Sequence, residues 1–204
     1  MSDTRRQDAH WFGPQASQGR AKGAGHPVLF GFSPALQFVD FPDGGGYPLG
    51  FLEKAYSTLG VTDPSKVLHL CSGSMRVGVR VDIRPEMQPT VVADCTKLPF
   101  PDNTFQWVMA DPPYAESYAH HLYDTKDKYP RPGSILREAA RVLVPGGRVG
   151  ILHFLVPMVR KPMRIVNVWG VTTGGGYAIR AWSVFEKEAQ SELDLIWEDE
   201  PEQE

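Results

Sequence analysis

Long apolar runs and cysteines are what this sequence has least of. Its 204 residues contain no stretch of eighteen consecutive apolar residues, and residues 1–25 are polar, so the sequence predicts neither a transmembrane helix nor a secretory signal peptide. The only two cysteines, Cys71 and Cys95, are too few for a disulfide framework or a cysteine zinc site. We therefore expect a cytoplasmic protein, without membrane association, in which both cysteines are thiols.

Charge is distributed unevenly along the chain. Residues 186–204 hold nine acidic side chains and one basic side chain, whereas residues 1–185 hold 20 basic and 15 acidic side chains, a net charge of +5. Because acidic runs usually stay solvated, we expect an unstructured acidic tail at residues 187–204, with competition for a nucleic-acid surface as the alternative. The mildly positive body permits a polyanionic partner without requiring one.

The chain is long enough for one domain with a full core, and 42% of its residues are hydrophobic. We predict a flexible arm at residues 1–26 and a folded domain at residues 27–186. Short apolar runs predict strands at residues 67–70, 77–83, 90–93, 105–110 and 148–154. Residues 164–172 and 177–185 flank a Gly-Gly-Gly turn and predict an antiparallel hairpin.

Two amphipathic helices are predicted among these strands. The first follows Pro48, has apolar residues at i, i+3, i+4 and i+7 from Leu52 to Leu59, and is expected to end at Gly60. The second is expected to start with Ser134 as its cap and to end before Pro145-Gly146-Gly147. Strands that alternate with helices indicate an α/β fold with a mostly parallel sheet.

Candidate ligand-binding residues follow three successive strands. In an open α/β sheet, ligands bind outside the carboxyl ends of the strands. The turn Cys71-Ser72-Gly73-Ser74 lets a ligand approach the backbone, Asp82 can accept hydrogen bonds from a ribose diol, and Asp94 with Cys95 can read the edge of an adenine. Together they predict an adenosine site, although each residue alone can also be an ordinary turn or cap.

The sequence Asp111-Pro112-Pro113-Tyr114 at the end of the fourth strand is the most specific motif. An amino group on a heteroaromatic ring is a poor nucleophile because its lone pair is delocalised into the ring. A carboxylate and a backbone carbonyl that accept its two N–H groups favour a pyramidal nitrogen, and two prolines fix the backbone that aims these acceptors. Tyr114 offers a flat face for an extruded base.

These motifs, in this order, resemble those of class I methyltransferases that modify amino groups of nucleobases, such as DNA adenine-N6, DNA cytosine-N4 and RNA guanine-N2 enzymes. The resemblance covers residues 47–186. It implies a seven-stranded Rossmann-like sheet with a C-terminal antiparallel hairpin, and S-adenosylmethionine as cofactor. It also assigns roles: Gly73 to the methionine part of the cofactor, Asp82 to the ribose, Asp94 to the adenine, and residues 111–114 to the target amine.

Two features depart from the family pattern. His69 stands where the family has an acid before the loop, and only one of its usual glycines, Gly73, remains. Nine positions separate Gly73 from Asp82, so the first crossover must be shortened and its helix absent or reduced to one turn. The full set of expected cofactor-binding residues is His69, Cys71, Ser72, Gly73, Ser74, Asp82, Asp94 and Cys95.

The sequence therefore predicts an enzyme that methylates an exocyclic amino group of a nucleobase, with DNA adenine N6 or cytosine N4 preferred. An RNA base amine and a non-catalytic binding subunit with the methyltransferase fold are the alternatives. Because the chain has no residues to spare for a sequence-reading domain, we expect target recognition to come from the loop after Tyr114 or from a protein partner. We expect no metal site, since His120 and His121 lack an identifiable third ligand.

Overall fold

The computed structural model describes residue 47 and residues 50–115, 129–172 and 178–189. The predicted arm at residues 1–26, the two histidines 120 and 121, and the tail beyond residue 189 lie outside these residues, so those predictions stay open. In the part that is described, no helix has the length and apolarity that crossing a membrane requires.

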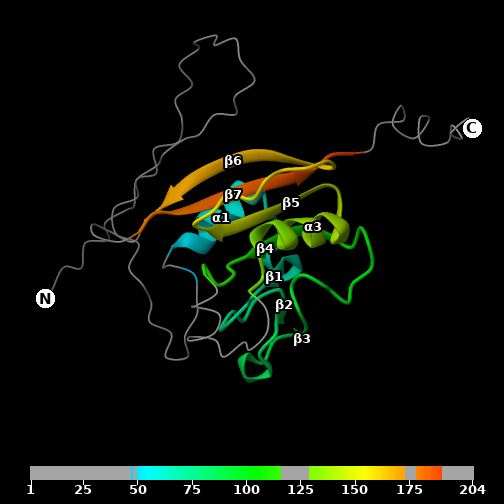
Figure 1. Ribbon diagram of the computed structural model, residues 1–204. Coiled ribbons are helices and arrows are strands. Elements are labelled where there is room, and N and C mark those ends of the chain that lie inside the picture. Colours follow the sequence, from blue (N-terminus) through cyan, green and yellow to red (C-terminus); the bar gives the residue numbers. More distant parts are fainter. Residues whose placement is uncertain (1–46, 48–49, 116–128, 173–177, 190–204) are drawn as a thin grey trace, which may run out of the picture.

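Seven strands form one sheet in the order β3-β2-β1-β4-β5-β7-β6 (Figure 1). Strands β1 to β5 pair in parallel, whereas β7 runs antiparallel to both β5 and β6. The strands are β1 (Leu68–Leu70), β2 (Val79–Asp82), β3 (Val91–Val92), β4 (Phe105–Ala110), β5 (Leu143–His153), β6 (Met163–Val171) and β7 (Arg180–Lys187). This order confirms the predicted Rossmann-like sheet and its C-terminal antiparallel pair. Lys187, assigned from sequence to the tail, is the last residue of β7.

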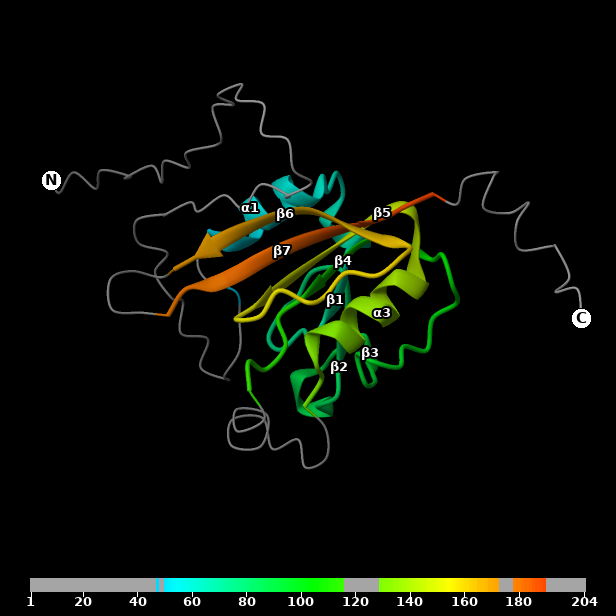
Figure 2. The ribbon, with the colours of Figure 1, turned by 45° about the horizontal axis from the view of Figure 1, so that its top comes forward.

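Two helices cover opposite faces of the sheet, as Figure 2 shows. Helix α1 (Phe51–Leu59) ends at Gly60, whose φ of 72° and backbone N–H bonded to Ser57 confirm the predicted glycine cap. It packs its apolar side on Trp182 and its neighbours, whereas α3 (Pro132–Val142) packs Ile135 and other apolar residues on the opposite face.

The second helix begins and ends earlier than predicted. Its cap is Arg131, and Pro132 takes the first helical position, where its fixed φ suits a helix and its missing N–H costs nothing. Ser134 therefore lies inside α3 and is not its cap. The helix stops at Val142, and β5 begins at the next residue, so Pro145-Gly146-Gly147 forms an irregular start of this strand rather than a helix stop.

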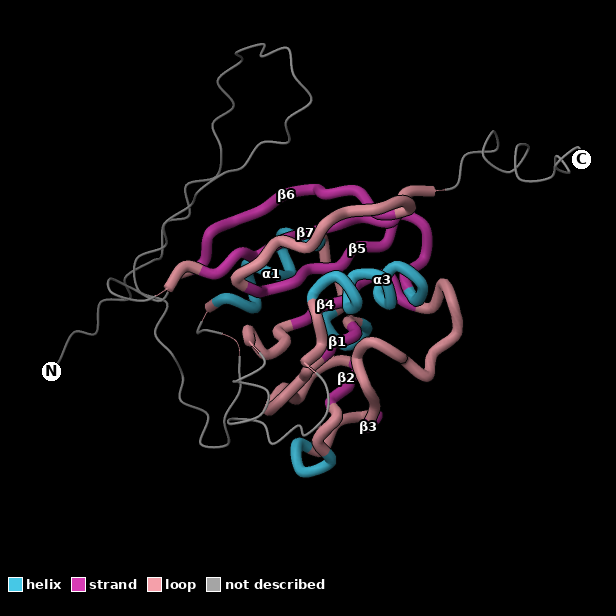
Figure 3. Tube along the Cα trace, viewed as in Figure 1, coloured by secondary structure: helices cyan, strands magenta, loops and turns pink. Residues whose placement is uncertain are grey.

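The predicted shortening of the first crossover is confirmed. Residues 71–78 join β1 to β2 without a helix, and a single 3-10 turn, η2 (Pro85–Met87), stands between β2 and β3 (Figure 3). A short connection demands unusual backbone angles: Cys71 and Gly73 have φ of 53° and 48°. At Gly78, with φ of 77°, an added Cβ would lie 2.4 Å from the carbonyl oxygen of Val67, so only glycine fits beneath β1.

Candidate active site

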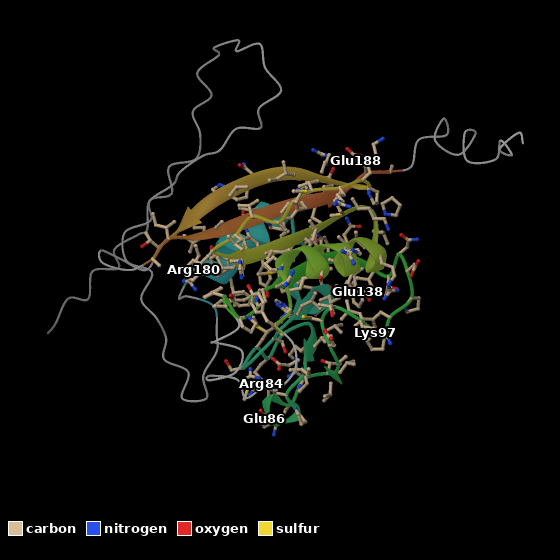
Figure 4. All side chains as sticks on the ribbon, in the orientation of Figure 1. Arg84, Glu86, Lys97, Glu138, Arg180 and Glu188 are labelled. Atoms are coloured by element: carbon tan, nitrogen blue, oxygen red, sulfur yellow. The ribbon has the colours of Figure 1, made fainter. Side chains whose placement is uncertain are left out.

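The edge of the sheet where β1 to β5 end gathers the residues that the sequence singled out. Parallel strands direct their carboxyl ends to one edge, so the loops after β1, β2, β3 and β4 meet there. Strand β7 runs the other way, and its first residues pair with the last residues of β5, His153 with Ala181. Arg180 therefore joins this edge from the far end of the sequence (Figure 4).

Asp111 and Tyr114 contact each other inside their own motif. The Tyr114 hydroxyl donates a hydrogen bond of 2.7 Å to Oδ1 of Asp111 and accepts one of 2.8 Å from Nη1 of Arg180. The Tyr114 ring also lies beside Phe154, with ring centroids 4.8 Å apart. The motif thus presents a carboxylate and an aromatic ring at the end of β4, held by a cation from β7.

The surroundings set the protonation of both groups. Burial raises the pKa of Asp111 to about 6, although the Tyr114 hydrogen bond and the Arg180 charge oppose the rise. Burial and the nearby Asp111 charge raise the pKa of Tyr114, so its hydroxyl keeps its proton and acts as the donor. Above pH 6 the site therefore holds an ionised acceptor.

A buried histidine supports the motif from behind. The ring atom Nδ1 of His153 accepts the N–H of Leu155 at 2.9 Å, and burial lowers the pKa of this histidine, so a neutral ring carries its proton on Nε2. Nε2 lies 2.9 Å from the hydroxyl of Tyr129, which donates in turn to the carbonyl oxygen of Tyr114 at 3.3 Å. This chain of hydrogen bonds fixes the backbone that follows Pro112 and Pro113.

The loop after β1 is tied to the end of β2. The N–H of Gly73 donates to Oδ2 of Asp82 at 2.8 Å, and Oδ1 accepts from both the backbone N–H and Nε of Arg84, at 3.0 and 3.2 Å. Asp82 is only 4% exposed. Its carboxylate thus already receives three hydrogen bonds from the chain, and its predicted contact with a ribose remains a prediction.

Asp94 and Cys95 lie beyond the short β3. Oδ1 of Asp94 accepts hydrogen bonds from the backbone N–H and the hydroxyl of Thr96, at 2.8 and 2.7 Å, which is the geometry of a turn cap. Cys95 is buried with its Sγ 3.5 Å from Sγ of Cys71. That contact and burial raise the pKa of Cys71. The ends of β1 and β3 therefore meet through two thiols, and the contact of Asp94 and Cys95 with an adenine stays a prediction.

Unsatisfied polar atoms surround the end of β1. Four buried side-chain atoms of the described residues have no hydrogen-bond partner, and three of them belong to this region: the hydroxyls of Tyr47 and Ser72 and Nδ1 of His69; the fourth is the hydroxyl of Ser183 on β7. Burial lowers the pKa of His69 to about 4, so its ring is neutral at pH 7. Buried polar groups are rarely left unpaired, so these atoms suit a polar ligand such as a cofactor with amino, carboxylate and hydroxyl groups. Ser74, the last residue of the predicted turn, lies beside them in sequence and takes part in an interaction of its own.

Sequence reasoning missed three residues of this edge: Tyr129, His153 and Arg180. His153 and Arg180 stand far from the motifs in sequence and lie inside apolar runs, where side chains ordinarily pack, whereas Tyr129 stands in a polar stretch without a motif of its own. The one available signal was the charge of Arg180 at the start of a strand that is otherwise buried.

Several solved structures are similar at low identity. TrmN from Thermus thermophilus is 20% identical with a TM-score of 0.49, over 66% of this chain and 47% of that chain, so the present chain spans about half of TrmN. The putative methyltransferase yhhF from Escherichia coli is 13% identical with a TM-score of 0.49, over 78% and 94%. A complex of the Haloferax volcanii methyltransferase activator Trm112 and a putative methyltransferase is 16% identical with a TM-score of 0.48, over 69% of this chain and 89% of that chain. Similarities of this size say nothing of the substrate.

No curated protein sequence matches the chain. A family model described as a methyltransferase domain matches residues 43–151, more than half of the chain and the whole stretch from α1 through most of β5. The matched residues include the loop after β1, Asp82, Asp94 and the motif at the end of β4. The chain therefore belongs to the methyltransferase-domain family, and the expected enzyme class, an S-adenosylmethionine-dependent methyltransferase, is confirmed.

Proposed function

We propose that this enzyme methylates an exocyclic amino nitrogen of a nucleobase, with adenine N6 or cytosine N4 in DNA as the first choice. The observation that carries the proposal is the partly buried carboxylate of Asp111, held by Tyr114 at the end of β4 beside two successive prolines. A carboxylate in that place accepts an N–H and does not need to be a strong base.

The chain's residues would act on the amine rather than on the methyl group. S-adenosylmethionine supplies an electrophilic methyl group whose bonding electrons stay on the departing sulfur. The Asp111 carboxylate accepts one amine N–H, and a carbonyl in the Pro112-Pro113 segment accepts the other, so the nitrogen lone pair turns out of the ring. As the N–C bond forms, the nitrogen becomes cationic and releases one proton to Asp111 or to solvent.

The cofactor would lie over the loop after β1. His69, Cys71, Ser72, Gly73 and Ser74 would hold its methionine part, consistent with the unsatisfied atoms of His69 and Ser72. Asp94 and Cys95 would bind the adenine. Because Asp82 binds the loop so closely, its contribution to cofactor affinity would come mainly through the position of Gly73.

The surface beside Asp111 supports a flat, partly apolar substrate. Phe154, Leu155, Val156 and Met158 follow β5 and are all more than 40% exposed. Phe154 contacts Tyr114, so an extruded base would meet aromatic and aliphatic side chains next to the acceptor. The positive charge of residues 1–185 suits a nucleic acid, and target recognition would come from a protein partner or from loops around the site.

The test is a methylation assay with isotope-labelled S-adenosylmethionine and separate pools of DNA and RNA, read by nucleoside mass spectrometry. We expect labelled N6-methyladenine or N4-methylcytosine from DNA. Asp111→Asn should lower the rate by at least about 100-fold while calorimetry shows cofactor affinity within a few-fold. Asp102→Asn, at an exposed aspartate, is the matched control. If only amino groups of RNA bases are labelled, RNA and not DNA is the substrate. If neither pool is labelled although the cofactor binds, the proposal is overturned.

A further inference from the structure

Arg180 is a buried cation at the candidate active site. It is only 8% exposed and is the first residue of β7, where the antiparallel direction of this strand brings it to the carboxyl ends of β4 and β5 (Figure 4). Burying a guanidinium is costly unless it is bound by acceptors. One acceptor of Arg180 is the hydroxyl of Tyr114, in the motif at the end of β4.

The direction of the hydrogen bonds follows from the chemistry of the groups. An arginine can only donate, so the Tyr114 oxygen accepts the 2.8 Å hydrogen bond from Nη1 of Arg180. The single hydrogen of this hydroxyl then lies along the 2.7 Å contact to Oδ1 of Asp111. The guanidinium also lies 5.7 Å from the centroid of the Tyr114 ring.

We propose that Arg180 is a positioning residue, which directs the Tyr114 hydroxyl onto Oδ1 of Asp111 and so reserves Oδ2 of this carboxylate for the substrate amine. The proposal rests on the proposed function, because it assigns Asp111 the role of amine acceptor. Within the described residues, the Tyr114 hydroxyl is the one donor to Asp111. The same contacts fix the Tyr114 ring beside Phe154, where a planar base would stack.

Electrostatics supports this arrangement. Burial raises the pKa of Asp111, and the Tyr114 hydrogen bond and the Arg180 charge are the two influences that lower it. The other ionisable groups close to this carboxylate are Tyr47 and Cys71, and burial raises the pKa of Tyr47 while the Cys95 contact and burial raise that of Cys71. Both stay neutral at pH 7, so Arg180 is the cation that offsets Asp111.

The experiment measures the titration of Asp111 directly, without substrate. In carboxyl-labelled full-length protein, ¹³C NMR with Asp111→Asn for assignment should give a pKa of about 6 for Asp111. In Arg180→Met we expect this pKa to rise to about 7, because the opposite charge and the ordered hydroxyl are both lost. Arg180→Lys should restore part of the difference. Arg164→Met, at a half-exposed arginine on β6, is the control and should leave Asp111 unchanged.

A second variant keeps the proposal testable if Arg180→Met does not fold. Tyr114→Phe removes the hydroxyl that joins Arg180 to Asp111 and should also raise the pKa of Asp111. In the double variant, we expect this pKa to rise by less than the sum of the two single rises. An Asp111 pKa that stays within about 0.2 of the wild type in folded Arg180 variants would overturn the proposal. Because the readout needs no substrate, a missing methylation product would refute the proposed substrate, whereas an unchanged Asp111 pKa would refute the positioning of Asp111 by Arg180 and Tyr114.

Discussion

The backbone N–H of Gly73 donates a 2.8 Å hydrogen bond to Oδ2 of Asp82, which joins the loop after β1 to the end of β2. Residues 71–78 hold no helix that would brace this loop from outside. The Asp82 carboxylate instead holds the loop through Oδ2, while its Oδ1 binds Arg84. One side chain thus does locally what a crossover helix does in a longer chain.

Asp82→Ala should lower the free energy of unfolding by about 3 kcal/mol, because it leaves the Gly73 N–H and the Arg84 donors without their acceptor in a buried place. Urea denaturation followed by circular dichroism measures this change. Asp63→Ala is the matched control: Asp63 also accepts a backbone N–H, from Ser65, but is exposed, so we expect a loss below about 1 kcal/mol. Equal losses in the two variants would contradict the role of Asp82.

Gly150→Ala should be among the most destabilising single substitutions. An added Cβ at this position of β5 would lie 2.1 Å from the ring carbon Cη2 of Trp182, whose indole N–H donates to Thr58 on α1 at 2.9 Å. The indole is buried and held at both ends, so we expect a loss of about 3 kcal/mol or more in thermal or urea unfolding.

Gly133→Ala provides the comparison in the same experiment. No atom lies within 4 Å of a Cβ added there, and the residue stands in the first turn of α3. Alanine favours a helix over glycine by about 0.5–1 kcal/mol, so this variant should be equally or more stable than the wild type. A tolerated alanine at Gly150 would show that Trp182 does not pack as described.

Methyl transfer should depend on pH through Asp111. Its raised pKa of about 6 means that the acceptor form, the carboxylate, prevails above pH 6 and is lost as the pH falls below it. We expect kcat/KM to fall about tenfold per pH unit below pH 6 and to be flat from pH 7 to 8. Asp111→Asn should lack this limb. If kcat/KM of Asp111→Asn fell at the same pH as that of the wild type, the fall would belong to another ionisable group.

His69 should link stability to acid. Its folded pKa is lowered from 6.5 to about 4, so the stability that it contributes is complete above pH 6.5 and is lost as the pH falls toward 4, a change of up to about 3 kcal/mol. Asp111 acts with the opposite sign, because its raised pKa makes ionisation unfavourable between pH 3.8 and 6.

The measurement therefore compares the free energy of unfolding of the wild type with that of His69→Asn, because both proteins contain Asp111 and its contribution cancels. His69→Asn should be less stable than the wild type at pH 7, and this gap should narrow between pH 6.5 and 4.5 in urea titrations. A gap that is constant with pH would mean that His69 is already protonated in the fold or accessible to water.

The sheet was predictable because its strands carry local signals. The strand at residues 105–110 was predicted with the observed bounds, since an apolar run stands there between polar turns and ends at Asp111. The end of α1 was predictable from Gly60. The start of α3 was not, because Ser134 and Pro132 both signal a helix start and only the position of the preceding backbone decides between them.

The candidate site was predictable only in its β1 to β4 part. Motif residues there follow their strands directly, so strand order along the chain placed Gly73, Asp82 and Asp111 together. Arg180, by contrast, reaches the site because β7 lies between β5 and β6 in the reverse direction. The sequence predicted an antiparallel hairpin but carried no signal that its second strand, β7, pairs with β5.

The insertion of β7 between two earlier strands has a consequence for biosynthesis. Until residues 180–187 have left the ribosome, β5 and β6 have no partner between them and expose unpaired backbone edges. A nascent chain that stops short of this strand already contains the whole Asp-Pro-Pro-Tyr turn, yet lacks the guanidinium that orders it. The ordering of this candidate site is thus coupled to the closing of the sheet by β7.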